Sequence, residues 1–124
     1  MEPLMILLGW TGIYGVLALS AIASALGCAR AGQAANGAML EVDGGYGRFI
    51  GLSAMPSSQT IYGIVVMLAL NREVTAVNGP GLFAIGVLAG LALMVSAVLQ
   101  GNCCRAWIIE RNNTGKNFVK HDAE

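Results

Sequence analysis

Three long stretches of this chain carry no Asp, Glu, Lys or Arg, and they constrain its fold more than any other sequence feature. They run from Pro3 to Ala29, from Phe49 to Asn71 and from Val74 to Cys104. Each is longer than the ~20 apolar residues that a helix needs to cross a bilayer. Because helices satisfy their own backbone hydrogen bonds in lipid, the pattern predicts an all-α membrane protein with three transmembrane helices.

We expect a single membrane domain over residues 1–124. Its expected parts are a first helix at about 4–36, a second at about 49–70, a third at about 81–109 and a polar tail at 110–124. A polar, Gly-rich turn from Glu41 to Arg48 joins the first two helices. The breaker Gly79-Pro80-Gly81 is expected to close the second connection.

Composition excludes several function classes. Hydrophobic residues make up 56% of the chain, and seven Lys and Arg balance seven Asp and Glu. A neutral chain lacks the basic stripe that nucleic-acid binding needs, so we expect no nucleic-acid partner. Three cysteines without a C-x-x-C pair, and one histidine, give no firm metal site.

The positive residues divide unevenly between the two sides of the predicted bundle. The first loop and the tail hold six of them: Arg30, Arg48, Arg105, Arg111, Lys116 and Lys120. The second connection holds only Arg72. With three spans, the positive-inside rule places the first loop and the tail in the cytoplasm and the N-terminus outside.

Polar side chains interrupt the second and third spans. Ser58 and Gln59 follow Pro56, and Gln100 lies in the third span. A buried amide costs free energy unless it is hydrogen-bonded. Two interpretations stay open at this point: hydrogen bonds that hold helices together, or an ion site built from oxygen ligands, which suit hard cations.

A weak internal repeat relates the first and third helices. A shift of 72 positions aligns Gly15–Ala34 with Val87–Ala106, with four identities in twenty positions. Both segments are dense in small residues, which allow helices to approach closely in lipid. If the repeat is real, its unit is a two-helix hairpin, and the partner of the third helix would fall at 121–143.

Several of these segments resemble the proteolipid (rotor-ring) subunit of bacterial V-type ATPases and ATP synthases. The resemblance covers roughly residues 10–109 and rests on Gly27–Gly32, Leu52–Gly63 and Ser96–Gly101. It implies a fold of two duplicated helical hairpins. It also implies a ring of identical copies in the bacterial inner membrane, which contacts a stator subunit and a central stalk and carries H⁺ or Na⁺.

The resemblance also implies roles for individual residues. The ion-binding shell would comprise Met55 through its carbonyl, with Ser58, Gln59, Tyr62 and Gln100. The stalk-contact loop would comprise Glu41, Asp43, Tyr46 and Arg48, although a solvated turn explains the same loop. The subunit itself would hydrolyse no ATP and would need no cofactor besides the transported ion.

One part of the family pattern has no match in this sequence. The essential carboxylate of this family lies on a fourth helix, and Lys120–Glu124 does not continue into one. We therefore expect the duplicated architecture to be truncated before helix four. The alternative function is a truncated or accessory multispan membrane protein without transport activity.

Overall fold

The computed structural model describes the backbone of residues 1–121 and the side chains of residues 1–114. All the regular secondary structure in the described residues is helical. It contains α1 (Glu2–Met39), α2 (Tyr46–Ala54), α3 (Ser58–Leu70) and α4 (Gly79–His121), and one 3-10 turn, Met55–Ser57, joins α2 to α3. Three helical segments are long and apolar enough to span a membrane: Glu2–Met39, Tyr46–Leu70 and Gly79–Thr114. The predicted fold class is confirmed.

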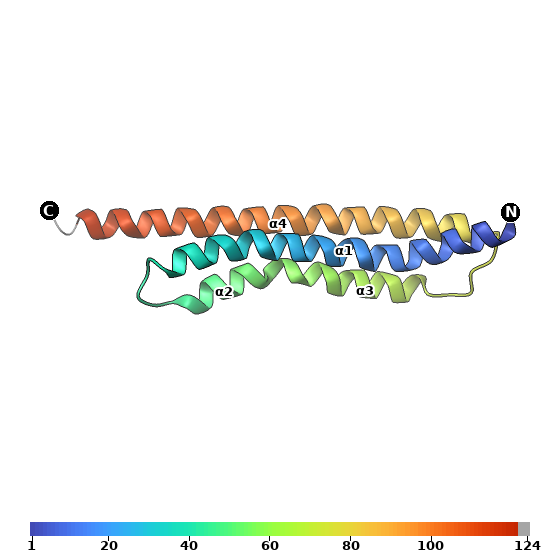
Figure 1. Cartoon of the computed structure of the whole chain (residues 1–124), viewed down its shortest axis with the longest axis horizontal. Helices are drawn as coiled ribbons and strands as arrows, with labels where there is room; N and C mark the ends of the chain where they lie inside the picture. Colours follow the sequence, from blue (N-terminus) through green and yellow to red (C-terminus); the bar gives the residue numbers. More distant parts are fainter. Residues whose placement is uncertain (122–124) are drawn as a thin grey trace.

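The helices form one elongated bundle (Figure 1). α1 and α4 start at the same end and run parallel to each other. α2 and α3, which come between them in the sequence, run antiparallel to both. At 1.5 Å per residue, the 38 residues of α1 extend about 57 Å. This is well beyond the ~30 Å hydrocarbon core of a bilayer, so part of the bundle continues outside it.

The helix bounds differ from the expected ones mainly in α4. The third helix does not stop near 109, because α4 continues without a break to His121. Residues 110–121 of the expected tail are therefore helical, and residues 122–124 lie outside the described residues.

The Gly79-Pro80-Gly81 segment also behaves differently from the prediction. Instead of closing the loop, it forms the first turn of α4. Proline is tolerated there because the first backbone N–H groups of a helix have no partner within it. The loop before it is fixed by Asn78, whose Oδ1 accepts a 2.8 Å bond from the Thr75 N–H.

Glycines set the distance between α1 and α4. A Cβ on Gly86 would overlap the Gly12 carbonyl, and a Cβ on Gly101 would lie 2.5 Å from Gly27 Cα. These contacts place two helix backbones directly against each other, as small residues permit in lipid.

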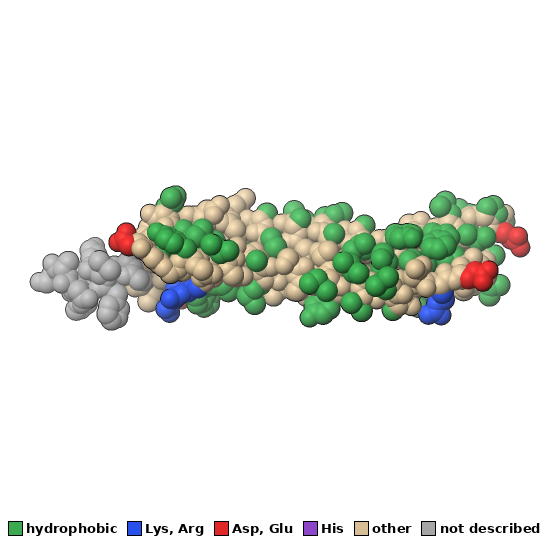
Figure 2. Space-filling view, turned by 90° about the horizontal axis from the view of Figure 1, so that it is seen from below, with side chains coloured by type: hydrophobic (Ala, Val, Ile, Leu, Met, Phe, Trp, Pro, Cys, Tyr) green, Lys and Arg blue, Asp and Glu red, His purple; other side chains and the backbone are tan. Residues whose placement is uncertain are grey.

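Two buried hydrophobic clusters lie toward opposite ends of the bundle. Ile13, Leu70 and Leu82 form the cluster near the N-terminus. Ala35, Ala38, Phe49 and Ile108 form the cluster near the first loop, where α2 covers α1 and α4. In the face shown in Figure 2, hydrophobic side chains are spread along the bundle, and charged side chains gather toward its ends. The three helices and this surface make the chain an integral membrane protein.

Candidate polar site within the helices

The main candidate site is a set of hydrogen-bonded polar side chains between α3 and α4, here called the polar layer: Ser58, Gln59, Ser96 and Gln100. Gln59 is 7% exposed and lies at its centre. Its Nε2 donates a 2.8 Å hydrogen bond to Gln100 Oε1 and a 3.3 Å bond to Ser96 Oγ. Both amide hydrogens of a buried glutamine are thus satisfied.

Pro56 explains the position of the polar layer along the second span. Proline has no N–H to donate within the helix, and the chain tightens into the 3-10 turn Met55–Ser57 before α3 begins. This turn brings the Met55 carbonyl within 3.1 Å of Ser58 Oγ. The same hydroxyl lies 3.2 Å from Gln59 Oε1, so it can donate to either acceptor.

Four of the five predicted shell residues therefore lie in one network: Met55, Ser58, Gln59 and Gln100. Tyr62 is not part of it. Its side chain is 57% exposed on α3, and no hydrogen bond among the described residues joins it to the polar layer. The predicted shell thus contributes one backbone carbonyl, one hydroxyl and two amides to the network.

Ser96 is the member of the network that sequence reasoning did not assign. It lies four residues before Gln100, and residues i and i+4 share one face of a helix. That spacing was the available signal. Ser96 is exposed at the edge of α4, so the polar layer reaches the surface of the described bundle there.

The polar layer contains amides, hydroxyls and a backbone carbonyl, and none of its side chains is a carboxylate. Such groups donate and accept hydrogen bonds, but they do not change charge near neutral pH. Within the described residues, no group of three or more His, Cys, Asp or Glu side chains is placed to hold a metal ion.

The predicted stalk-contact residues gather at the far end of the bundle, and Glu41, Asp43, Tyr46 and Arg48 are all exposed. The turn needs Gly45, whose φ of 78° lies in the left-handed region that favours glycine. Tyr46 donates a 3.0 Å bond from its hydroxyl to the Val42 carbonyl.

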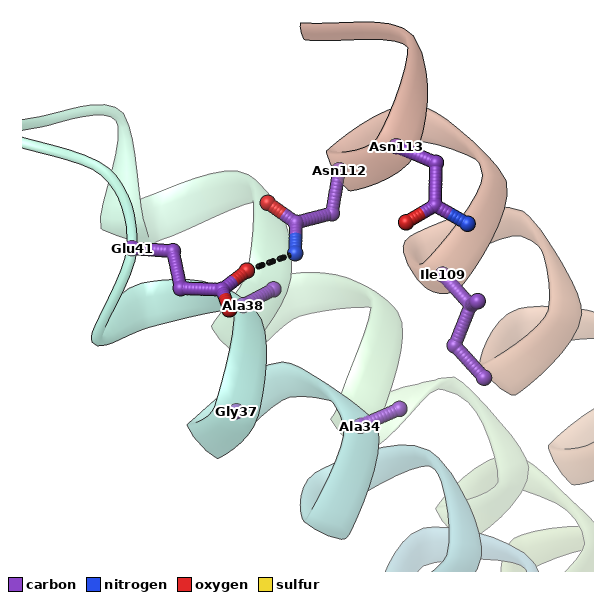
Figure 3. Close-up of a pocket in the computed structure, with 7 residues that line it drawn as sticks. All are labelled: Ala34, Gly37, Ala38, Glu41, Ile109, Asn112 and Asn113. Carbon is purple, nitrogen blue, oxygen red and sulfur yellow. Dashed lines mark hydrogen bonds between the residues drawn. The ribbon is translucent and has the colours of Figure 1, made fainter. Parts of the chain in front are cut away.

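Glu41 also ties the first loop to α4. Figure 3 shows its carboxylate facing Asn112 across a surface pocket, and the Asn112 amide donates to Glu41 Oε2. The pocket floor is formed by Ala34, Ala38 and Ile109. The loop is thus held against the extended part of α4.

The three cysteines, Cys28, Cys103 and Cys104, are free thiols. Cys28 Sγ lies 4.0 Å from the Ala54 carbonyl, a distance typical of a weak S–H donor.

Comparison with known proteins bears on α1 to α3. A search of the curated proteins and a search of the solved structures found no match. Residues 11–70 match the family model of the ATP synthase C subunit. The matched segment begins in α1, ends at the last residue of α3 and contains Met55, Ser58 and Gln59. By sequence, this α1–α3 segment is therefore similar to the C subunit of ATP synthase.

Proposed function

We propose that this chain is a rotor-ring subunit of a V-type ATPase or ATP synthase in a bacterial inner membrane. It would take part in H⁺ or Na⁺ translocation coupled to ATP hydrolysis or synthesis, and a separate catalytic part would handle ATP. The observation that carries the proposal is the buried, hydrogen-bonded Gln59, which lies in a segment, residues 11–70, that matches the family of ATP synthase C subunits. Members of that family form oligomeric rings within ATP synthase.

The polar layer supplies the oxygens that such a site needs. The Met55 carbonyl, the Ser58 hydroxyl and the Gln59 and Gln100 amides present oxygen ligands to a hard cation. A protonated carboxyl group would use the same neighbours as hydrogen-bond partners. The arrangement therefore supports either ion.

A carboxylate must complete the site. A charged group facing lipid costs about 2.5–3.5 kcal/mol or more, and an ion-carrying carboxylate avoids that cost when H⁺ or Na⁺ neutralises it. The polar layer has no carboxylate of its own. We propose that the group comes from outside the described residues or from another chain, and that this chain alone binds no Na⁺ strongly.

The partners follow from the same assignment. Copies of the chain would pack into a ring through their membrane-spanning helices. The exposed loop residues Glu41, Asp43, Tyr46 and Arg48 would contact the central stalk. Tyr62, exposed on α3 close to the polar layer, would face the neighbouring protomer that completes the site.

The experiment is to extract the tagged chain from native membranes and measure the mass of the complex, followed by ATP-driven H⁺ and Na⁺ uptake into vesicles. A large detergent-resistant ring with uptake that falls in Gln59→Leu is expected. The matched control is Ser53→Ala, because Ser53 bonds only to Ile50 of its own helix in the same segment. A stable monomer or dimer would contradict the rotor assignment.

One observation favours a second candidate function, an accessory membrane protein without transport. The polar layer is fully neutral and internally hydrogen-bonded, as a purely structural contact between helices would be. A stable monomer or dimer that supports no ion uptake, with either Gln59 or Leu at this position, would support that candidate.

A further inference from the structure

One buried polar group on α1 has no partner. Ser24 is 4% exposed. Its buried hydroxyl makes no hydrogen bond to any of the described residues. Its neighbour one turn earlier behaves differently, since Ser20 donates a 2.9 Å bond to the Leu17 carbonyl of its own helix. Buried hydroxyls are nearly always paired. We therefore expect the Ser24 hydroxyl to have a partner that the described side chains and backbone do not supply.

Two contacts between α1 and the second span bracket Ser24. Ser20, one turn before it on the same face, fills the space beside Gly63 of α3. On the other side, a Cβ on Gly27 would lie 2.7 Å from Pro56 Cβ. Ser24 lies between Ser20 and Gly27 along α1, and Gln59 lies between Pro56 and Gly63 along the antiparallel second span. The two residues therefore fall at the same level of the bundle.

Gln59 has one hydrogen-bonding position left. Its two N–H donors are used by Ser96 and Gln100, and its Oε1 accepts at most one bond among the described residues, from the Ser58 hydroxyl. A carbonyl oxygen has two acceptor positions, so one remains on Oε1. A water molecule that accepts from Ser24 and donates to Gln59 would satisfy both groups, and buried waters bind at sites with two to four such partners.

We propose that one buried water molecule binds Ser24 Oγ and links it to Gln59 Oε1. Ser24 donates its hydroxyl hydrogen to the water, and the water donates to the free acceptor position of Gln59. The polar layer then connects all three spans through α1, α3 and α4. The site is independent of ion transport and would exist in a structural protein as well.

The test compares Ser24→Ala with Ser20→Ala in the thermal unfolding of the full chain in detergent micelles. Ser24→Ala is expected to lower the unfolding midpoint by several degrees, because the water is lost and Gln59 loses a donor. Ser20→Ala, which loses only a hydrogen bond within its own helix, is expected to lower it less. A midpoint that rises or stays constant in Ser24→Ala would overturn the proposal, because removing an unpaired hydroxyl from a dry site relieves a penalty.

Two further measurements address the link to Gln59. In a Gln59→Leu background, Ser24→Ala should cause almost no further loss; the same loss in both backgrounds would overturn the bridge. In wild-type chain, NMR magnetisation transfer from a long-lived water to the Ser24 amide proton is expected. Absence of transfer at Ser24, with transfer present at Asp43 in the exposed first loop, would overturn the water itself.

Discussion

Arg30 of α1 donates a 3.1 Å hydrogen bond from Nη1 to Oδ1 of Asn102 on α4, and the two residues are 72 positions apart in the sequence. This separation equals the shift that aligns Gly15–Ala34 with Val87–Ala106. The two segments of the weak repeat thus lie side by side, parallel and nearly in register. The geometry agrees with two copies of one helix type, while a duplicated hairpin remains a prediction.

The close contact of these helices gives the first prediction. Gly86→Ala should lower the free energy of unfolding by about 1–3 kcal/mol, because the new Cβ overlaps the Gly12 carbonyl and forces the backbones apart. The control is Gly15→Ala, since nothing lies within 4 Å of a Cβ at that position. It should raise stability by up to about 1 kcal/mol through helix propensity. Unfolding in mixed detergent, followed by circular dichroism, measures both.

The cluster near the first loop gives a second prediction, with two adjacent isoleucines as a matched pair. Ile108 is fully buried against Phe49, Ala35 and Ala38, whereas Ile109 is 44% exposed. Ile108→Ala should cost about 2–5 kcal/mol by leaving a cavity. Ile109→Ala should cost much less in the same unfolding assay. Equal losses would contradict the rotation of α4 about its axis at this height.

The Gln59–Gln100 bond gives a third prediction, measured by a double-mutant cycle. Gln59→Leu, Gln100→Leu and the double variant should give a coupling energy of roughly 0.5–2 kcal/mol, the range found for hydrogen bonds between membrane helices. Tyr62→Leu combined with Gln100→Leu is the control, because Tyr62 makes no hydrogen bond to the layer. Additive effects in the first cycle would contradict the 2.8 Å contact.

The sequence predicts the three spans correctly because charge-free runs of this length have few alternatives to a helix in lipid. It misses the continuation of α4 past residue 109, where hydropathy falls and Asn112, Asn113 and Gly115 are poor helix formers. That part of α4 is held by packing, namely Ile108 under Phe49 and Asn112 on Glu41. Such contacts join positions about 60 to 70 apart, which a local pattern does not record.

The polar layer, too, is only partly predictable from the sequence. The interruption of apolar spans by Gln59 and Gln100 marks both residues in the sequence, but not the direction in which each points. Ser96 joins them only because α3 and α4 pack at one particular rotation. Tyr62, three residues from Gln59, lies outside the network because that rotation leaves it exposed on the outer surface of the described bundle.

The direction of insertion gives the last prediction, since the uneven distribution of Lys and Arg predicts that the first loop lies in the cytoplasm. In a chain whose three cysteines are replaced, Val77→Cys and Asp43→Cys each introduce one thiol at an exposed loop position, and Val77 is 92% exposed. An impermeant maleimide added to intact cells should label Val77→Cys and spare Asp43→Cys until the membrane is opened. The cysteine-free parent gives the background. Labelling of Asp43→Cys alone on intact cells would reverse the orientation, and it would place the loop of Glu41 and Arg48 on the side away from any cytoplasmic stalk.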